Sequence, residues 1–248
     1  MRQLKLCISL LLLLSLSGCG FGQGGSTSVN PSVEQSQTKD TTPPALTQTE
    51  EIESPAAEIT ASYYEELQKV KEAGDKVAAY VEQTPIYEYQ VAMGLAVSDY
   101  TNAQNLQVIT DPSERADYMA RYHKDYDDML TYFIEQEIGV LEAKALGITV
   151  DEQQLRTATE KEWEQILGTE SMQKELEALG ITAEEYFETY QYPGRLRNTY
   201  FNQLFEQLLP VEDFLDADGM LDKEKRDGAI AEKLQEMKQK YNIRILES

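Results

Sequence analysis

The stretch "ALGIT" occurs twice in this chain, at Ala145–Thr149 and at Ala178–Thr182, and acidic residues follow each copy. Each Leu-Gly pair predicts the end of a helix, because glycine readily takes the left-handed conformation just past the last turn. We expect the Ile to fold back onto that turn, as in a Schellman motif. Each copy therefore predicts a joint between two helices.

The threonine of each copy is expected to cap the next helix. Thr149 with Glu152, and Thr182 with Glu185, have the spacing of a capping box. The 33-residue offset between the copies is close to the period of some helical repeats. The Trp, Gly, Tyr, Ala and Pro positions of a tetratricopeptide array are absent, however, so the copies predict helix joints and not a repeat array.

The residues around the joints predict further elements. Asp111-Pro112-Ser113-Glu114 predicts the start of one long helix that ends at Gly147, because it offers an Asp cap followed by Pro and Glu. Pro193-Gly194 should kink or break the helix that begins at Ala183. The other expected helices are 58–73, 87–105, 151–167, 171–179, 196–209 and 229–241, with an acidic connector over 210–228.

Two short segments predict strands. Val77–Val81 is rich in β-branched and aromatic residues and stops before Thr84-Pro85, and Ile243–Leu246 lies near the end of the chain. We expect these two strands to pair. The predicted fold is therefore a mainly α, multi-helix domain over 59–248, with a small two-strand pairing of an early strand and the C-terminal strand.

The first residues resemble a bacterial lipoprotein signal. Arg2 and Lys5 precede an apolar run, Leu6–Leu16, that is too short to span a bilayer as a stable helix. The run ends in Leu16-Ser17-Gly18-Cys19, which resembles the lipobox, where the cysteine is lipidated after cleavage. We expect 1–18 to be a signal peptide and Cys19 to carry acyl chains such as palmitate; the alternative is an ordinary secretory signal.

Composition predicts a tether behind that anchor. Residues 20–58 are rich in Gly, Ser, Thr, Gln and Pro and poor in large apolar residues, so they cannot bury enough surface to fold. A flexible coil of this length spans roughly 35 Å. The expected organisation is thus a signal peptide, a lipidated tether over 19–58 and a helical domain held outside the cytoplasm at the cell membrane.

Charge limits the partners. The chain has a net charge of −22, and cleavage after Gly18 would remove Arg2 and Lys5 and no acid, which leaves −24. A chain this acidic repels phosphate backbones, so no nucleic acid is expected. Cys7 lies in the predicted signal peptide, so the mature chain would hold no cysteine besides Cys19 for a nucleophile, metal or disulfide.

The order of elements resembles the N-terminal chaperone domain of the SurA and PrsA foldases. Residues 133–150 resemble that family's "LI-x-x-x-L…EA-x-x-LGI-x-V" helix, and 238–245 resemble its closing helix and strand. Val77–Val81 with Pro85-Ile86 resembles its opening strand and turn, although Glu82-Gln83 stands where the family often has Asn-Gly. The resemblance covers about residues 75–246. It implies a chaperone-like domain that binds unfolded chains.

The family's catalytic part has no counterpart here. In those foldases a parvulin prolyl-isomerase domain of about 90 residues usually precedes the closing helix, whereas here only 210–228 occupies that place. The single histidine, His123, is expected on the polar side of the long helix. Acid pairs such as Asp127-Asp128 and Glu184-Glu185 arise easily among 44 acids. Asp216-Ala217-Asp218-Gly219 fails as an EF-hand, because Phe214 and Lys225 stand at its first and last ligand positions. We expect no enzyme activity, cofactor or metal.

Aromatic side chains are the candidate binding residues. Tyr combines an apolar ring with a polar tip, which suits a surface that holds unfolded segments. The alternative is a packed core between helices. The candidates recur every four residues in the long helix or crowd around Pro193: Tyr118, Tyr122, Tyr126, Tyr186, Phe187, Tyr190 and Tyr192.

The sequence thus predicts a lipid-anchored, chaperone-like holdase without isomerase activity. Its expected partners are unfolded or partly folded secreted and envelope proteins, and the bilayer through Cys19. The runner-up is a structural or assembly lipoprotein that holds one dedicated protein partner. A broad open aromatic groove would favour the first, and a filled core with a small patch would favour the second.

Overall fold

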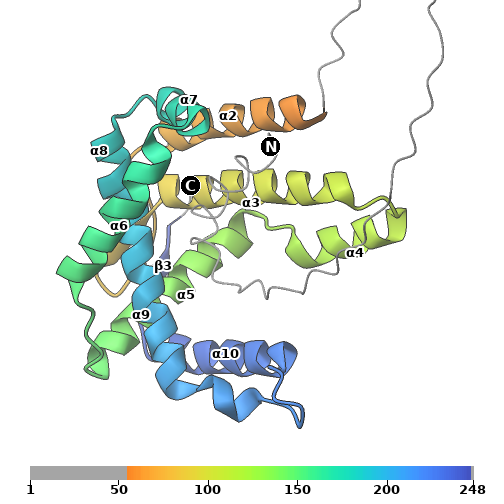
Figure 1. Cartoon of the computed structure of the whole chain (residues 1–248). Helices are drawn as coiled ribbons and strands as arrows, with labels where there is room; N and C mark the ends of the chain where they lie inside the picture. The colour runs from red at the N-terminus through yellow and green to blue at the C-terminus, as the bar shows by residue number, and fades with distance from the viewer. Residues whose placement is uncertain (1–54, 247–248) are drawn as a thin grey trace, which may run out of the picture.

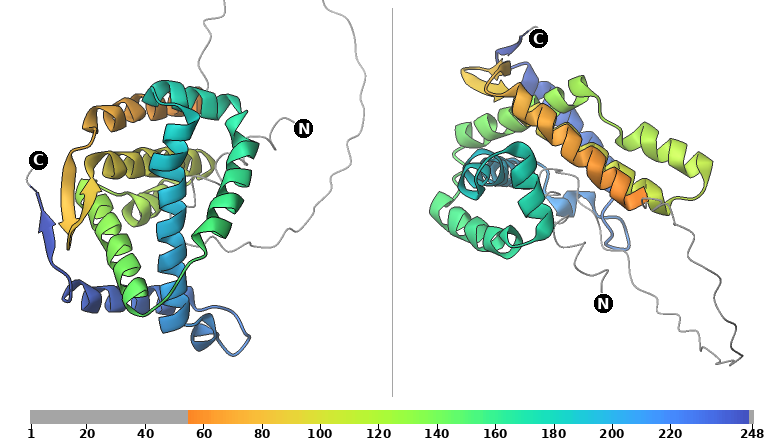
Figure 2. Two further views of the ribbon diagram at one scale, coloured as in Figure 1. Left: turned by 90° about the vertical axis from the view of Figure 1, so that its left-hand side faces the viewer. Right: turned by 90° about the horizontal axis from the view of Figure 1, so that it is seen from above.

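The computed structural model describes residues 55–246, which are mainly helical with a small antiparallel sheet (Figure 1). Helices α6 and α9 lie side by side. Helices α2, α3 and α10 lie on one side of this pair and run in roughly the same direction (Figures 1 and 2). The elements are α2 (Pro55–Ala73), β1 (Val77–Val81), β2 (Thr84–Tyr87), α3 (Glu88–Val108), α4 (Pro112–Tyr122), α5 (Tyr126–Ala145), α6 (Glu152–Leu167), α7 (Glu170–Leu179), α8 (Ala183–Tyr186), the π-helix η2 (Phe187–Gln191), α9 (Tyr192–Leu208), the 3-10 helix η3 (Val211–Phe214), α10 (Lys223–Lys238) and β3 (Ile243–Ile245).

The predicted pairing of Val77–Val81 with the C-terminal strand is confirmed. Strand β3 lies antiparallel to β1, with Tyr80 opposite Arg244 and Val81 opposite Ile243. One more backbone hydrogen bond extends the pairing, from Leu246 N–H to the Ala78 carbonyl at 2.9 Å. The first and last described elements of the sheet are therefore neighbours in space (Figure 2).

A third strand, β2, corrects the two-strand expectation. The sheet order is β2-β1-β3, and β2 pairs with β1 through the two-residue turn Glu82-Gln83. Pro85 lies in β2, where it is tolerated because β2 is an edge strand. Glu82 takes a left-handed conformation, with φ 55°. Its N–H donates to the Asn242 carbonyl and its carboxylate accepts from the Asn242 N–H, both at 2.8 Å, so the turn is held by the segment before β3.

The two Ala-Leu-Gly-Ile-Thr joints share their first half. Gly147 and Gly180 both have positive φ, 77° and 68°. In each copy the Ile N–H donates back five residues, Ile148 to the Ala143 carbonyl at 2.9 Å and Ile181 to the Leu176 carbonyl at 3.2 Å. Both predicted Schellman ends are confirmed.

The second half of the joints differs. Thr182 forms the predicted capping box with Glu185, with hydrogen bonds of 3.1 and 2.7 Å. The predicted cap at Thr149 is wrong: Asp151 caps α6 by accepting from Gln154 N–H at 2.9 Å. Asp is as good a cap as Thr. Because the helix starts two residues later than predicted, Val150 lies before it and packs against the core.

The predicted long helix from Asp111 to Gly147 is two helices. α4 ends at Tyr122, and Asp125 starts α5 with a capping box to Asp128. The break is stabilised from α3, because Asn102 Nδ2 donates to the Tyr122 carbonyl at 3.2 Å. His123 consequently lies exposed in the break and not on a helix.

The predicted disruption at Pro193 takes the form of a change of helix type. Residues 187–191 form a π-helix, and Tyr192 N–H donates to the Phe187 carbonyl five residues back. Proline has no N–H to donate and its ring crowds the carbonyl four residues earlier, so a wider turn before Pro193 relieves both problems. The chain then continues as α9 without a break.

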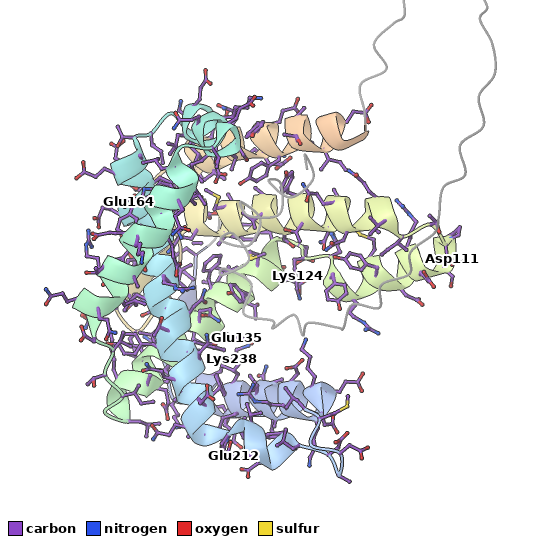
Figure 3. The ribbon with its side chains drawn as sticks, in the orientation of Figure 1. Asp111, Lys124, Glu135, Glu164, Glu212 and Lys238 are labelled. Atoms are coloured by element: carbon purple, nitrogen blue, oxygen red, sulfur yellow. The ribbon has the colours of Figure 1, made fainter. Side chains whose placement is uncertain are left out.

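The acidic connector is shorter than expected. α10 begins at Lys223, where Asp222 accepts from Lys225 N–H at 3.0 Å, and not at Ala229. The preceding loop is closed by a bridge between Leu215 and Leu221. Lys238 of α10 pairs with Glu135 of α5 at 2.7 Å (Figure 3).

The buried side chains form two clusters on either side of α3. The aliphatic cluster joins the sheet to α5, α9 and α10, and the aromatic cluster joins α2, α3, α6, α7 and α8. Members of the aliphatic cluster are Ala78, Ala79, Val81, Ile86, Val91, Met129, Leu130, Phe133, Ile134, Ile138, Val140, Ala143, Tyr200, Leu204, Phe205, Leu234 and Met237. Members of the aromatic cluster are Tyr63, Leu67, Val70, Met93, Ala96, Val97, Trp163, Ile166, Met172, Leu179, Tyr186 and Phe187.

Two glycines allow the helices to approach closely. A Cβ on Gly94 of α3 would lie 2.6 Å from the Met129 sulfur on α5. A Cβ on Gly139 of α5 would lie 2.6 Å from the Phe201 ring on α9. Both distances are shorter than real contacts, so α3, α5 and α9 pack as closely as they do because these residues lack a side chain.

Candidate functional site: aromatic residues and a recess beside the π-helix

Two of the predicted binding residues belong to the core. Tyr186 is 2% exposed and Phe187 is 5% exposed. The Tyr186 ring stacks on Trp163 at 5.2 Å with an interplanar angle of 7°, and Phe187 packs beside the same indole at 6.3 Å. Their assignment as client-binding residues is therefore corrected, because rings that fill the aromatic cluster present no surface to a partner.

Tyr190 and Tyr192 are partly buried at the edge of the aromatic cluster. Tyr190 meets the edge of Tyr89 at 5.5 Å. Tyr192 lies beside Phe187, and the Arg156 guanidinium sits over its ring at 4.9 Å. Arg156 also pairs with Glu188 on the π-helix. These two tyrosines thus lie at the border between core and surface.

The other three tyrosines do not form one row, because the helix breaks between Tyr122 and Tyr126. The Tyr118 and Tyr122 rings pack 4.6 Å apart on α4. Tyr118 OH donates to Asn102 Oδ1 at 3.1 Å and accepts from Asn105 at 2.8 Å, which fixes α4 to α3. Tyr126 begins α5, donates to Glu88 at 2.7 Å and has a pKa raised by burial and by that carboxylate.

Helix α4 forms an arm with no buried residue of its own. It extends beside the far end of α3, with Asp111 at its tip and Lys124 near its base (Figure 3). Tyr122 is 41% exposed and Tyr126 is 37% exposed. The aromatic surface here consists of two half-exposed rings and not of a broad groove.

A small recess lies where the π-helix faces α3, α5 and α9. Its volume is about 20 Å³, and it is lined by Gln90, Met93, Gly94, Phe133, Thr189, Tyr190 and Arg197. Of these residues the sequence analysis named only Tyr190. The π-turn shifts Thr189 and Tyr190 from the register of a regular α-helix, and in this position both line the recess.

Arg197 is the charged group of the recess. It is partly buried, and burial lowers the pKa of its guanidinium while Glu137 raises it in part. The guanidinium lies over the Phe133 ring at 5.6 Å. Tyr190, also in the recess, has its pKa raised to about 12, first by burial, so its hydroxyl keeps its proton at neutral pH.

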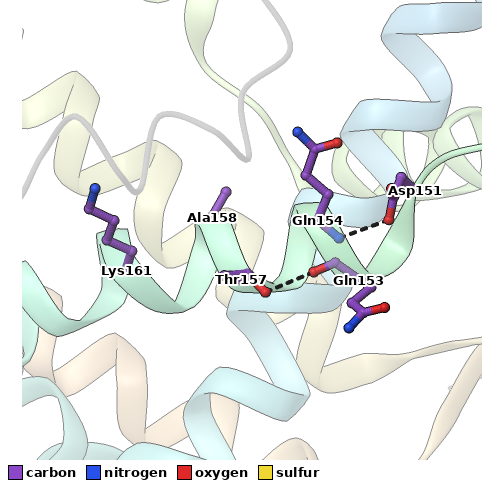
Figure 4. A pocket seen from close by; sticks show the side chains of 6 residues that line it. All are labelled: Asp151, Gln153, Gln154, Thr157, Ala158 and Lys161. Carbon is purple, nitrogen blue, oxygen red and sulfur yellow. Dashed lines mark hydrogen bonds between the residues drawn. The ribbon is translucent and has the colours of Figure 1, made fainter.

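A larger depression lies along α6 (Figure 4). Its volume is about 440 Å³, but it is shallow and the residues lining it are all on or next to one helix. Two of its polar groups serve the helix itself: Asp151 caps the first turn, and the Thr157 hydroxyl donates to the Gln153 carbonyl at 3.0 Å. The depression is a solvated helix face.

Residues 55–246 contain no cluster of three or more potential metal-binding side chains. Asp216 instead stabilises its own turn, accepting from the N–H groups of Asp218 and Met220 at 2.9 and 2.8 Å. Within the same range, every helix is too short or too polar to cross a bilayer. The predicted lipidation residue, Cys19, lies outside the described residues.

The chain was compared with known protein families, curated proteins and solved structures. No family model, no curated protein and no solved structure matches this chain.

Proposed function

We propose that the chain is a lipid-anchored, non-enzymatic protein of the extracytoplasmic membrane face that holds one dedicated polypeptide partner. The anchor rests on Leu16-Ser17-Gly18-Cys19 and the tether rests on the composition of 20–58. Two or more acyl chains give stable membrane attachment, whereas one gives only marginal binding. Strong negative charge keeps such a domain away from anionic headgroups and leaves its surface free for protein.

The burial of the aromatic residues is the observation that favours one dedicated partner over many unfolded clients. Tyr186 and Phe187 fill the core, and the half-exposed rings of Tyr122 and Tyr126 are few. A general holdase needs a broad and adaptable apolar surface. A small recess with defined polar groups suits a specific partner better, because correctly placed polar groups give specificity.

A general holdase remains the second candidate, and the C-terminal edge of the sheet favours it. Ile245 of the edge strand β3 is 64% exposed, and Leu246, just after the strand, is 41% exposed. An open edge can take up an extended peptide by adding a strand. The pairing of β1 with β3 joins the two segments that resemble the opening and closing strands of SurA and PrsA.

The test is chemical cross-linking of the full chain in its own envelope, followed by recovery and direct binding of each purified candidate. We expect one protein at near-equal stoichiometry that binds the purified chain one to one. Many unrelated proteins in small amounts would favour the holdase, as would slower aggregation of an unfolded client. Acceleration of prolyl isomerisation would contradict both candidates.

The matched variant is Cys19→Ala. It should abolish lipidation and leave the protein unprocessed or released, while the folded domain keeps its partner in solution. Fractionation of this variant with membranes in the same proportion as the parent would refute the anchor.

A further inference from the structure

The recess beside the π-helix is lined by hydrogen-bond donors that lack acceptors. Gln90 uses its Oε1 to accept from Tyr87 N–H at 2.8 Å, so its amide N–H groups remain for another partner. Within residues 55–246 neither these N–H groups nor the hydroxyls of Thr189 and Tyr190 have a hydrogen-bond partner. No acidic residue lines the recess.

Arg197 adds an unpaired cation to these donors. Across residues 55–246 its guanidinium makes no hydrogen bond and no ion pair; Glu137, the carboxylate that acts on it, does not come within ion-pair distance. Its near neighbour Arg195 pairs with Glu162 at 3.4 Å. In a chain with 44 acidic residues, a partly buried arginine without a carboxylate has an unused capacity for one.

The size of the recess limits what it can hold. The recess has a volume of about 20 Å³, so it can take only a small group of a larger ligand. A carboxylate places two oxygens side by side, in the geometry that a guanidinium fork binds. A tetrahedral phosphate is bulkier, and the remainder of any larger ligand must lie outside the recess.

We propose that this recess is a carboxylate-binding subsite, in which Arg197, Gln90 and Thr189 hold a carboxylate group of the partner polypeptide. The assignment rests on the proposed function for the identity of the partner, but not for the chemistry of the subsite. Met93 and Phe133 supply an apolar floor, which strengthens charge-assisted hydrogen bonds by excluding water. Tyr190 donates from the side of the π-helix.

The experiment uses the full chain in neutral detergent and three kinds of probe. Sodium acetate tests the free group, with chloride at equal ionic strength as reference. Acetyl-Ala-Ala-Phe as free acid and as amide tests a chain terminus, and acetyl-Ala-Glu-Ala amide tests a side chain. Binding is followed by calorimetry and by the shift in melting temperature, since a ligand specific for the folded state raises it.

Arg197→Gln should weaken the binding of acetate and of the carboxylate peptides by about tenfold or more, because charged hydrogen bonds are lost. Arg197→Lys keeps the charge without the fork and should fall between parent and Arg197→Gln. Arg195→Gln is the matched control and should bind as the parent does. Circular dichroism of each variant establishes that the fold is retained.

Three results would overturn the assignment: binding of phosphate in preference to acetate, equal binding of the free acid and amide peptides with no response to the glutamate peptide, or unchanged binding in Arg197→Gln. Failure of the proposed function is distinguishable from these results. Loss of carboxylate binding in Arg197→Gln without any partner in the envelope would support the subsite alone. If the Arg197→Gln variant captures a partner as well as the parent does, the proposed function is supported. The recess then plays no part in recognising that partner.

Discussion

The aliphatic and aromatic clusters stabilise the same domain by different means. The aliphatic cluster surrounds Ile138 and Leu204, both with no exposed surface, and has few buried polar groups. The aromatic cluster encloses a carboxyl group, Glu175, which is 2% exposed and accepts from Tyr186 OH at 2.6 Å. Residues 55–246 contain no cation paired with Glu175. The first cluster therefore depends on packing, and the second depends also on the protonation of one acid.

This difference has a consequence for pH. Burial raises the pKa of Glu175, and the hydrogen bond from Tyr186 opposes that rise in part. The folded state then binds a proton that the unfolded state releases near pH 4.3. The stability from this group is fully present below that pH and is lost as pH rises through the raised pKa of the folded state.

The largest expected effect is in the aliphatic cluster. Leu204→Ala should lower the free energy of unfolding by about 2–5 kcal/mol, because it leaves a cavity in a fully packed site. Denaturant unfolding measures the change. Leu146→Ala, at a leucine 46% exposed just after α5, is the control and should cost far less. Equal effects of the two variants would mean that the aliphatic cluster is not the packed core described above.

The next effect sharpens the contrast between the clusters. Glu175→Gln should raise the free energy of unfolding at neutral pH by about 1–3 kcal/mol, because a neutral amide needs no desolvation of charge. The gain should shrink as pH falls below the range in which Glu175 ionises in the folded state. Thermal unfolding of both proteins between pH 4 and pH 8 measures the difference.

The control for that experiment is Glu177→Gln, at an exposed position on the same helix. It changes the net charge by the same amount without touching the aromatic cluster. A gain that is equal in the two variants, or independent of pH, would show that total charge and not the buried carboxyl controls the stability.

The smallest effect compares the two helix joints. Thr182→Ala should cost about 1 kcal/mol, since it removes the capping hydrogen bond to Glu185 N–H. Thr149→Ala should cost at most about 0.5 kcal/mol, because Asp151 caps α6 in its place. Equal losses in chemical denaturation would contradict the assignment of the cap to Asp151.

Local signals in the sequence predicted most of the helices. The two Leu-Gly-Ile joints, the Asp111 cap and the pairing of Val77–Val81 with the C-terminal strand rest on short patterns whose physical cause is local or set by periodicity. The Asp125 cap is an equally local signal, since Asp128 follows it at the spacing of a capping box. It was missed because the sequence analysis predicted one uninterrupted helix through this position.

The remaining differences come from tertiary contacts. The two-residue turn between β1 and β2 requires the left-handed conformation of Glu82, and Asn242, far along the chain, holds that turn by two hydrogen bonds. The burial of Tyr186 depends on Trp163 and Glu175, which no periodicity links to it. The recess likewise joins residues of three helices and the π-helix, and of these the sequence pointed only to Tyr190.

The closure of the sheet sets the order in which this chain can complete its fold. β3 is the last strand within residues 55–246, and Asn242 bonds to Glu82, 160 positions earlier in the chain. Contacts of such long sequence separation form late, because the loop between them must be ordered first. A chain that emerges from its amino end carries β1 with one unpaired edge until residues 243–245 follow. The three-stranded sheet can therefore close only after residues 55–242 have been made.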